Sequence, residues 1–98
     1  MSSTSKGFAP TKFAARYVQQ LVKHWGHKFE TSYANGVGIV PFNESAIARF
    51  HVESEGVRID LQTATAEANE GLRGVIERHL DRFAFREAPL TYSWEDAE

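Results

Sequence analysis

Hydrophobic residues recur at two different spacings along the chain, and the change of spacing separates predicted helices from predicted strands. From Thr11 to Trp25 they lie three and four residues apart, which predicts an amphipathic helix between Pro10 and Gly26. A second helix is predicted from the N-cap residue Thr65 to about Ala84. The apolar positions of the second helix are Leu72, Val75, Ile76, Leu80 and Phe83, and His79 falls among them.

Between the two helices, apolar and polar residues alternate, which is the period of a strand with one buried face. The predicted strands span residues 28–33, 37–42, 46–53 and 57–62, and a last strand spans 90–95. Asn35-Gly36 predicts a tight hairpin turn between the first two strands. Pro41 indicates an edge position or a strand end, because proline has no N–H to donate to a neighbouring strand.

These elements predict an α+β fold, a two-layer α/β sandwich of order αββββαβ with a mainly antiparallel sheet and two helices on one face. Residues 1–10 are expected to be a flexible tail, residues 11–95 a single domain, and residues 96–98 an acidic end. The open face of the sheet is expected to carry Glu30, Arg49, His51, Arg58, Asp60 and Gln62. His51 and Asp60 could meet there as an acid–base pair. Two short sheet edges or a covered open face would suit a homodimer.

Composition excludes several classes of function. Among the 98 residues there is no cysteine, which excludes disulfides, thiolate metal sites and cysteine nucleophiles. No apolar run approaches the roughly 18 residues of a membrane span, and the first twelve residues lack a signal-peptide core, so a cytoplasmic protein is expected. A basic stripe, Lys12, Arg16 and Lys23, runs along the first helix, but the formal net charge of −2 argues against nucleic acid as the partner.

Three histidines lie near the predicted helix ends. His24 and His27 are three residues apart, and His79 could join them as a third metal ligand if the helix ends lie together. The alternative interpretation is structural: His24 and His27 would cap the first helix, and His79 would be a neutral core residue bonded to a carbonyl. The sequence identifies no cofactor and does not identify the metal.

Arg82 and Arg86 follow His79 and form a candidate anion-binding site together with Lys23 and Lys28. The alternative is that the arginines form surface ion pairs; the acids available nearby are Glu77, Asp81 and Glu87. Gly71 and Gly74, which lower helix propensity, are expected to permit a close approach of the second helix to the sheet.

Two stretches of the chain resemble a bacterial family catalogued as domain of unknown function 2218. They are KHxxHK, matched by residues 23–28, and HLxRFAFRE, matched by residues 79–87. The resemblance extends from the first helix to the last strand. It implies a short standalone protein, and the domain's occurrence beside siderophore-interacting flavin reductases implies an indirect link to iron handling. The family supplies no catalytic residues to carry over.

Three functional hypotheses remain open at this point. The first is a non-enzymatic binding or accessory module linked to iron or siderophore metabolism, with a small anionic ligand or a protein as partner. The second is a structural or protein-interaction domain, a homodimer without a small-molecule ligand. The third is a small enzyme using histidine acid–base chemistry, although the sequence contains no local enzyme signature.

Overall fold

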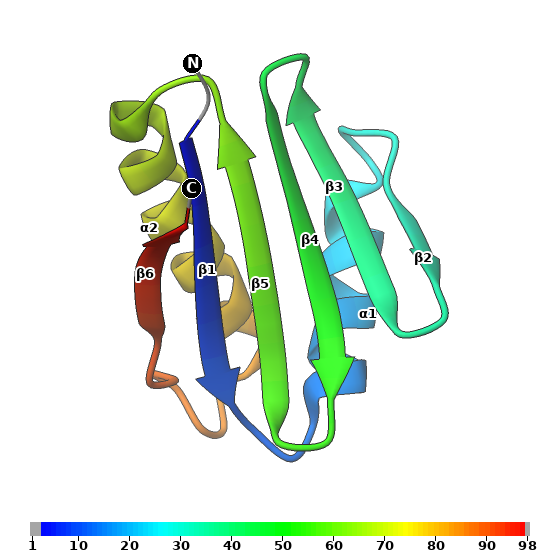
Figure 1. Ribbon diagram of the computed structural model, residues 1–98. Coiled ribbons are helices and arrows are strands. Elements are labelled where there is room, and N and C mark those ends of the chain that lie inside the picture. Colours follow the sequence, from blue (N-terminus) through cyan, green and yellow to red (C-terminus); the bar gives the residue numbers. More distant parts are fainter. Residues whose placement is uncertain (1–2, 98) are drawn as a thin grey trace.

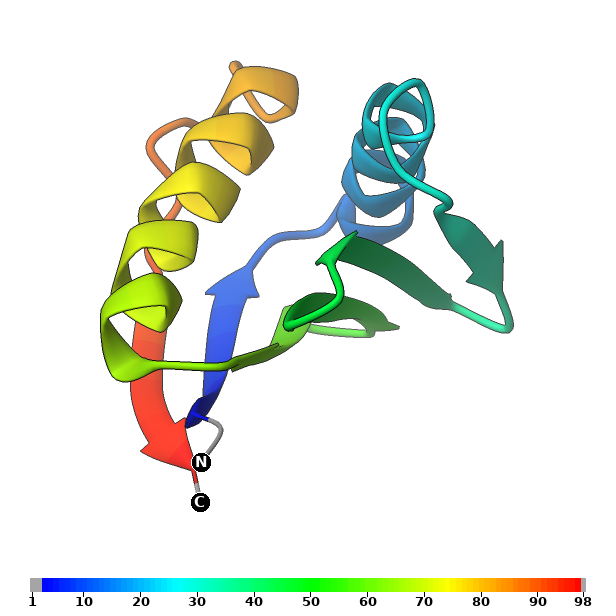
Figure 2. The same ribbon diagram turned by 90° about the horizontal axis from the view of Figure 1, so that it is seen from above.

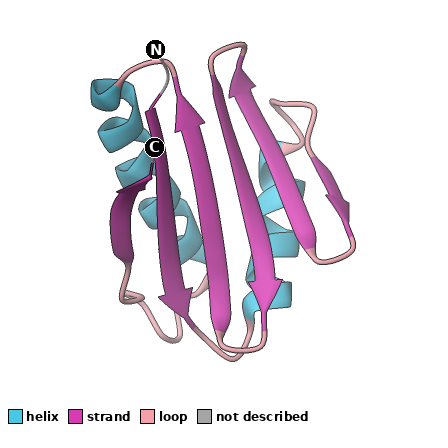
Figure 3. Cartoon of the chain, in the orientation of Figure 1, coloured by secondary structure: helices cyan, strands magenta, loops and turns pink. Residues whose placement is uncertain are grey.

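The protein is a six-stranded antiparallel sheet with two helices packed on one face (Figures 1 and 2). The computed structural model describes residues 3–97. The elements are β1 (Ser3–Pro10), α1 (Ala14–Trp25), β2 (Ser32–Ala34), β3 (Val37–Asn43), β4 (Ala46–Glu53), β5 (Gly56–Thr63), α2 (Ala66–Phe83) and β6 (Ser93–Ala97). The strand order is β2-β3-β4-β5-β1-β6, and every neighbouring pair is antiparallel (Figure 3). The predicted α+β two-layer fold is confirmed.

The expectation of a flexible N-terminal tail is wrong for residues 3–10. This segment is β1, an inner strand that pairs with β5 along its whole length and with β6 from Thr4 to Phe8. The order of elements is therefore βαββββαβ instead of αββββαβ. Hydrophobicity did not reveal the strand, because its helix-facing positions are the small residues Ser5, Gly7 and Ala9. The predicted acidic end also changes: Asp96 and Ala97 belong to β6, and Glu98 lies outside the described residues.

The hairpin predicted at Asn35-Gly36 is confirmed. Both residues have positive φ, 53° and 77°, as a tight two-residue turn requires. The first strand of this hairpin is shorter than predicted, because backbone hydrogen bonds from Lys28 and Phe29 to Trp25 fold residues 26–29 into a turn and a bend. Pro41 lies beyond the end of β2, where β3 is an edge, so its missing N–H removes no ladder bond.

The core lies between the helices and the sheet. The helix-facing side of α1 contributes Ala14, Tyr17, Val18, Leu21, Val22 and Trp25, all predicted from the periodicity. α1 packs closely on the sheet at Gly38, where an added Cβ would lie 2.6 Å from Val22. The predicted role of Gly71 and Gly74 is wrong: a Cβ on Gly71 would meet nothing within 4 Å, and one on Gly74 would meet only the side chain of Arg78.

Polar side chains connect α2 to two neighbouring inner strands of the sheet, β1 and β5. The amide of Asn69, which is 2% exposed, accepts hydrogen bonds from Ser5 Oγ at 2.8 Å and Arg73 Nε at 2.9 Å. Its Nδ2 donates to the carbonyl oxygens of Ser3 and Leu61. One residue of α2 thus joins β1 and β5, and this network holds the strand that the hydrophobic pattern missed. None of the helices in residues 3–97 is long and apolar enough to cross a membrane.

Candidate functional site

The predicted site residues lie on α1, on α2 and in the segments that follow these helices. Their positions follow from the packing of α1 against the second half of α2, where His24 meets His79 and Phe83. The ring centroids of the two histidines are 5.6 Å apart, and His79 also packs on Trp25 at 4.9 Å. The metal hypothesis required these two helix ends to lie together, and His24 and His79 do lie together.

His79 has the hydrogen bond expected of a structural histidine. Its Nδ1 lies 2.7 Å from the carbonyl oxygen of Val75, so Nδ1–H donates to that oxygen and Nε2 carries no proton in the neutral ring. His24 is half-buried beside it. Burial lowers the pKa of His24, and the nearby His79, Arg82 and His27 lower it further.

His27 does not complete a metal site with these two rings. It lies in the turn after α1 and is exposed, and its backbone N–H bonds the carbonyl of His24. Within residues 3–97, no group of three or more histidine, aspartate or glutamate side chains is arranged to hold a metal ion. Two imidazoles, those of His24 and His79, are therefore the ligands available for a metal ion at this site. Residues 3–97 supply no third ligand beside them.

The acids beside the predicted arginine site bind neutral donors. Asp81 Oδ1 accepts from the Leu90 N–H at 3.0 Å and from the Tyr92 hydroxyl at 2.8 Å. Glu77 accepts from Trp94 Nε1 at 2.7 Å. Burial raises the pKa of Tyr92 well above its usual range, and Asp81 raises it further, so the hydroxyl keeps its proton and continues to donate.

Glu87 is held in the same way at the other end of the loop. Its Oε2 accepts from Thr11 Oγ1 at 2.8 Å and from the hydroxyl of Tyr17. Burial raises the pKa of Tyr17, with Glu87 as the next cause. The loop after α2 is thereby tied to the segment between β1 and α1. The hydrophobic pattern carries no signal for these two hydrogen bonds, because Thr11 and Tyr17 are 76 and 70 residues away from Glu87 in the sequence.

The ion pairs predicted for Arg82 and Arg86 are absent from the described residues. Salt bridges there join only His51 to Asp60, Arg58 to Glu53, and Arg73 to Asp96. No described carboxylate lies within 4.0 Å of either guanidinium, and Glu77, Asp81 and Glu87 accept hydrogen bonds from neutral donors instead. The same holds for Arg16, Lys23 and Lys28. These arginines and lysines therefore keep their donors free of ion pairs within the described residues, while Glu77, Asp81 and Glu87 keep their own charges nearby.

A small cleft opens on this basic surface between the two helices. Its volume is about 150 Å³, and it is lined by Arg16, Tyr17, Gln20, Phe83, Phe85 and Arg86. Phe85 is 71% exposed, and the guanidinium carbon of Arg86 lies 5.7 Å from its ring centroid. Lys23 and Lys28 are exposed and do not line the cleft. The sequence pattern identified Arg16 only as part of a basic stripe. Phe85 has no periodic signal because it lies beyond α2.

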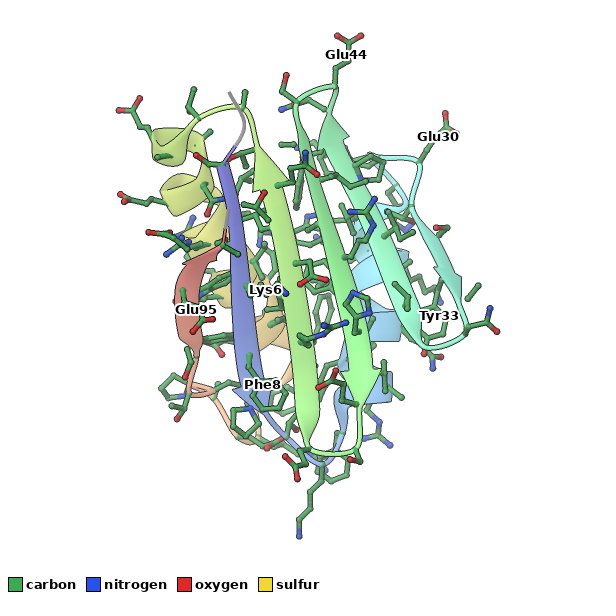
Figure 4. The ribbon with its side chains drawn as sticks, in the orientation of Figure 1. Lys6, Phe8, Glu30, Tyr33, Glu44 and Glu95 are labelled. Atoms are coloured by element: carbon green, nitrogen blue, oxygen red, sulfur yellow. The ribbon has the colours of Figure 1, made fainter. Side chains whose placement is uncertain are left out.

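The opposite face of the sheet carries the second candidate pair. Nε2 of His51 lies 3.0 Å from Oδ2 of Asp60, as the outward register of β4 and β5 predicted. Lys6 of β1 is opposite Asp60, and Figure 4 shows Lys6 and Phe8 on this same face. Glu30, predicted for this face, lies instead in the loop before β2. Neither His51 nor Asp60 lines the cleft described above.

Comparisons with known proteins identify the family. The chain matches the family described as "Uncharacterized protein conserved in bacteria (DUF2218)" over residues 6–95. It is also similar to the NMR structure of PA4090 from Pseudomonas aeruginosa, with 29% sequence identity, 95% of each chain covered and a TM-score of 0.80. No curated protein matches the chain. The resemblance at residues 23–28 and 79–87 is thus confirmed over almost the whole sequence, and the chain belongs to the DUF2218 family.

Proposed function

We propose that the protein is a non-enzymatic binding module for a small anionic ligand, held on the basic surface between α1 and the end of α2. The observation that supports this is the distribution of partners: the neighbouring carboxylates bind neutral donors, and Arg16, Arg82 and Arg86 have no carboxylate within 4.0 Å in residues 3–97. A guanidinium fork binds carboxylate or phosphate oxygens in pairs.

The lining of the cleft indicates which chemical group should accompany the anionic group of the ligand. Arg16 and Arg86 line it from different segments, and the rings of Phe83 and Phe85 lie beside them. A flat ring can stack on an exposed phenylalanine while its carboxylate meets a guanidinium. The volume of about 150 Å³ suits a small part of a ligand better than a whole drug-sized molecule, for which pockets of roughly 300 Å³ or more are usual. An aromatic carboxylate is therefore the ligand class that we propose.

The test is calorimetric titration with benzoate, with uncharged benzamide and inorganic phosphate as comparison probes. We expect saturable binding of benzoate, weaker binding of phosphate, and no binding of benzamide. Arg86→Gln and Arg16→Gln each remove one charged donor, so each should weaken benzoate binding by about tenfold or more. Arg49→Gln is the matched control, because Arg49 lies on the opposite face of the sheet.

Equal affinity of wild type and Arg86→Gln would overturn the proposal, as would the lack of saturable binding of either anion. Tighter binding of phosphate than of benzoate would contradict the aromatic component.

The link to iron or siderophore metabolism that the resemblance implies supplies one further probe. A negatively charged iron chelate, ferric citrate, has carboxylate oxygens that the same arginines could bind. If iron chelates use this surface, ferric citrate should compete with benzoate for binding. Arg86→Gln should then weaken the binding of both ligands. Binding of ferric citrate that survives Arg86→Gln would contradict that link.

A further inference from the structure

A separate cavity lies at the far end of the sheet, where β4 and β5 stop pairing. Their ladder ends at Ile47 and Gln62, although each strand continues by one residue. Beyond that point Ala46 turns back toward β3, and Thr63 pairs with Ser3 of β1 instead. Figure 1 shows the ends of the two strands diverging at this position.

Two hollows meet at this divergence, one on each side of the sheet. The hollow on the open face has a volume of about 520 Å³, and the one beside α2 has a volume of about 440 Å³. They share Asn43, Ser45, Ala46, Thr63 and Ala64. The two hollows thus form one elongated notch around the end of the β4–β5 pair, and each has the size usual for a ligand pocket, roughly 300–1,000 Å³.

The lining of the notch is largely apolar and includes one charged residue. Pro41 and Ile47 line its open-face part, and Leu72 and Val75 line the part beside α2. Neither part is lined by lysine, arginine or histidine. The one acid, Glu44, is at the tip of the β3–β4 turn, and Figure 4 shows its side chain extending away from the sheet. Such a surface discriminates against charged ligands, since burying a charge without a partner is costly.

Small residues line the part of the notch beside α2. Gly71 lowers helix propensity relative to alanine, and a Cβ there would meet nothing within 4 Å. Gly71 lines the notch on the side of α2, together with the small residues Ala64 and Ala68. The effect of these small residues is to keep the space beside Leu72 and Val75 open.

We propose that this notch binds an uncharged alkyl chain. The elongated shape suits a chain-like ligand, and the apolar lining gains free energy for each methylene removed from water. Asn43, Ser45 and Thr63 supply polar groups at the shared middle of the notch for a neutral head group. The site is distinct from the basic cleft and shares no residue with it.

The experiment is an amide NMR titration of the full chain with n-octanol, a neutral linear probe. We expect saturable shifts at Ala46, Thr63, Ala64 and Val75. Gly71→Phe places a ring in the notch and should weaken octanol binding by about tenfold, the equivalent of roughly two buried methylenes. Gly71→Ala is the matched control: it should keep octanol binding within about twofold, because one methyl group occupies little of the notch.

Thermal unfolding of each variant shows whether it is folded, and Ala68→Phe fills the same side of the notch from an exposed position if Gly71→Phe fails to fold. Shifts that do not saturate, shifts spread over the whole chain, or equal octanol binding by the wild type and the folded filling variant would overturn the proposal. Arg86→Gln should leave octanol binding unchanged, so failure at the notch and failure at the basic cleft are distinguishable.

Discussion

Individual side chains explain why residues far apart in the sequence hold together. Asn69 is the clearest case, since its amide bonds Ser5, Arg73 and two strand carbonyls while almost completely buried. The periodicity of α2 gave no reason to single it out, because a buried asparagine breaks the apolar pattern. Its partners other than Arg73 are on β1 and β5, and only the folded chain brings them within reach.

Asn69→Ala should lower the free energy of unfolding by about 1–3 kcal/mol, because it leaves the hydroxyl of Ser5 and a strand carbonyl without partners in the interior. Urea denaturation measures the change. Asn43→Ala is the control: Asn43 is exposed and accepts one turn hydrogen bond from Ser45, so its loss should cost less than about 1 kcal/mol. Equal effects of the two substitutions would contradict the structural role of Asn69.

The lowered pKa of His24 makes the free energy of unfolding depend on pH. Burial lowers the pKa of its imidazole below 6.5, and the neighbours His79, Arg82 and His27 act in the same direction. As pH falls below 6.5, the unfolded chain takes up this proton before the folded chain does, so the free energy of unfolding falls until the pH drops below the pKa of the folded state.

Wild type should therefore lose more stability than His24→Gln between about pH 7.5 and about pH 5. Urea denaturation at several pH values measures the difference, and His27→Gln, at an exposed position, is the comparison variant. The histidine ring NMR signals give a second reading. A His24 titration midpoint at or above 6.5 would refute the prediction.

At the scale of elements, strong local signals were predicted correctly. The helical face from Ala14 to Trp25 and the turn at Asn35-Gly36 are confirmed, because each depends on short-range spacing or on backbone conformation. The strand β1 was missed because Ser5, Gly7 and Ala9 bury little apolar area, and the strand is stabilised by pairing with β5 and β6. Pairing of that kind is a property of the tertiary fold and leaves no periodic pattern in the strand itself.

Glycines give a direct test of element packing. Gly71→Ala should raise the free energy of unfolding by up to about 1 kcal/mol, because alanine favours the helix and its methyl group meets nothing within 4 Å. Gly38→Ala should lower it by about 1–3 kcal/mol, because the added Cβ would lie 2.6 Å from Val22 on α1. Thermal or urea denaturation checks both substitutions. The reverse order of stabilities would mean that α1 and α2 do not pack on the sheet as described.

At the scale of the whole molecule, the two faces differ in chemistry. The helical side carries guanidinium groups without described carboxylate partners, and the sheet side carries the paired His51 and Asp60. The sequence was sufficient to name Arg82 and Arg86 as candidate anion-binding residues. The hydrogen bonds from neutral donors to Glu77, Asp81 and Glu87 were not predictable. Those donors come from the loop after α2, from β6, from the segment between β1 and α1, and from α1 itself.

The predicted homodimer stays a prediction. The sheet edges are β2, with three residues, and β6, with five, and short edges limit pairing between chains. Light scattering during gel filtration tests it: a dimer predicts twice the chain mass of 11.0 kDa.

The most direct test of the proposed function is an amide NMR map of the protein titrated with benzoate. Binding between α1 and the end of α2 predicts saturable shifts at Arg16, Tyr17, Gln20, Phe83, Phe85 and Arg86. The amides of β4 and β5 around His51 and Asp60 should not move. Shifts confined to the sheet face, or the absence of saturable shifts at the helix pair, would contradict the proposal that this basic surface is the binding site.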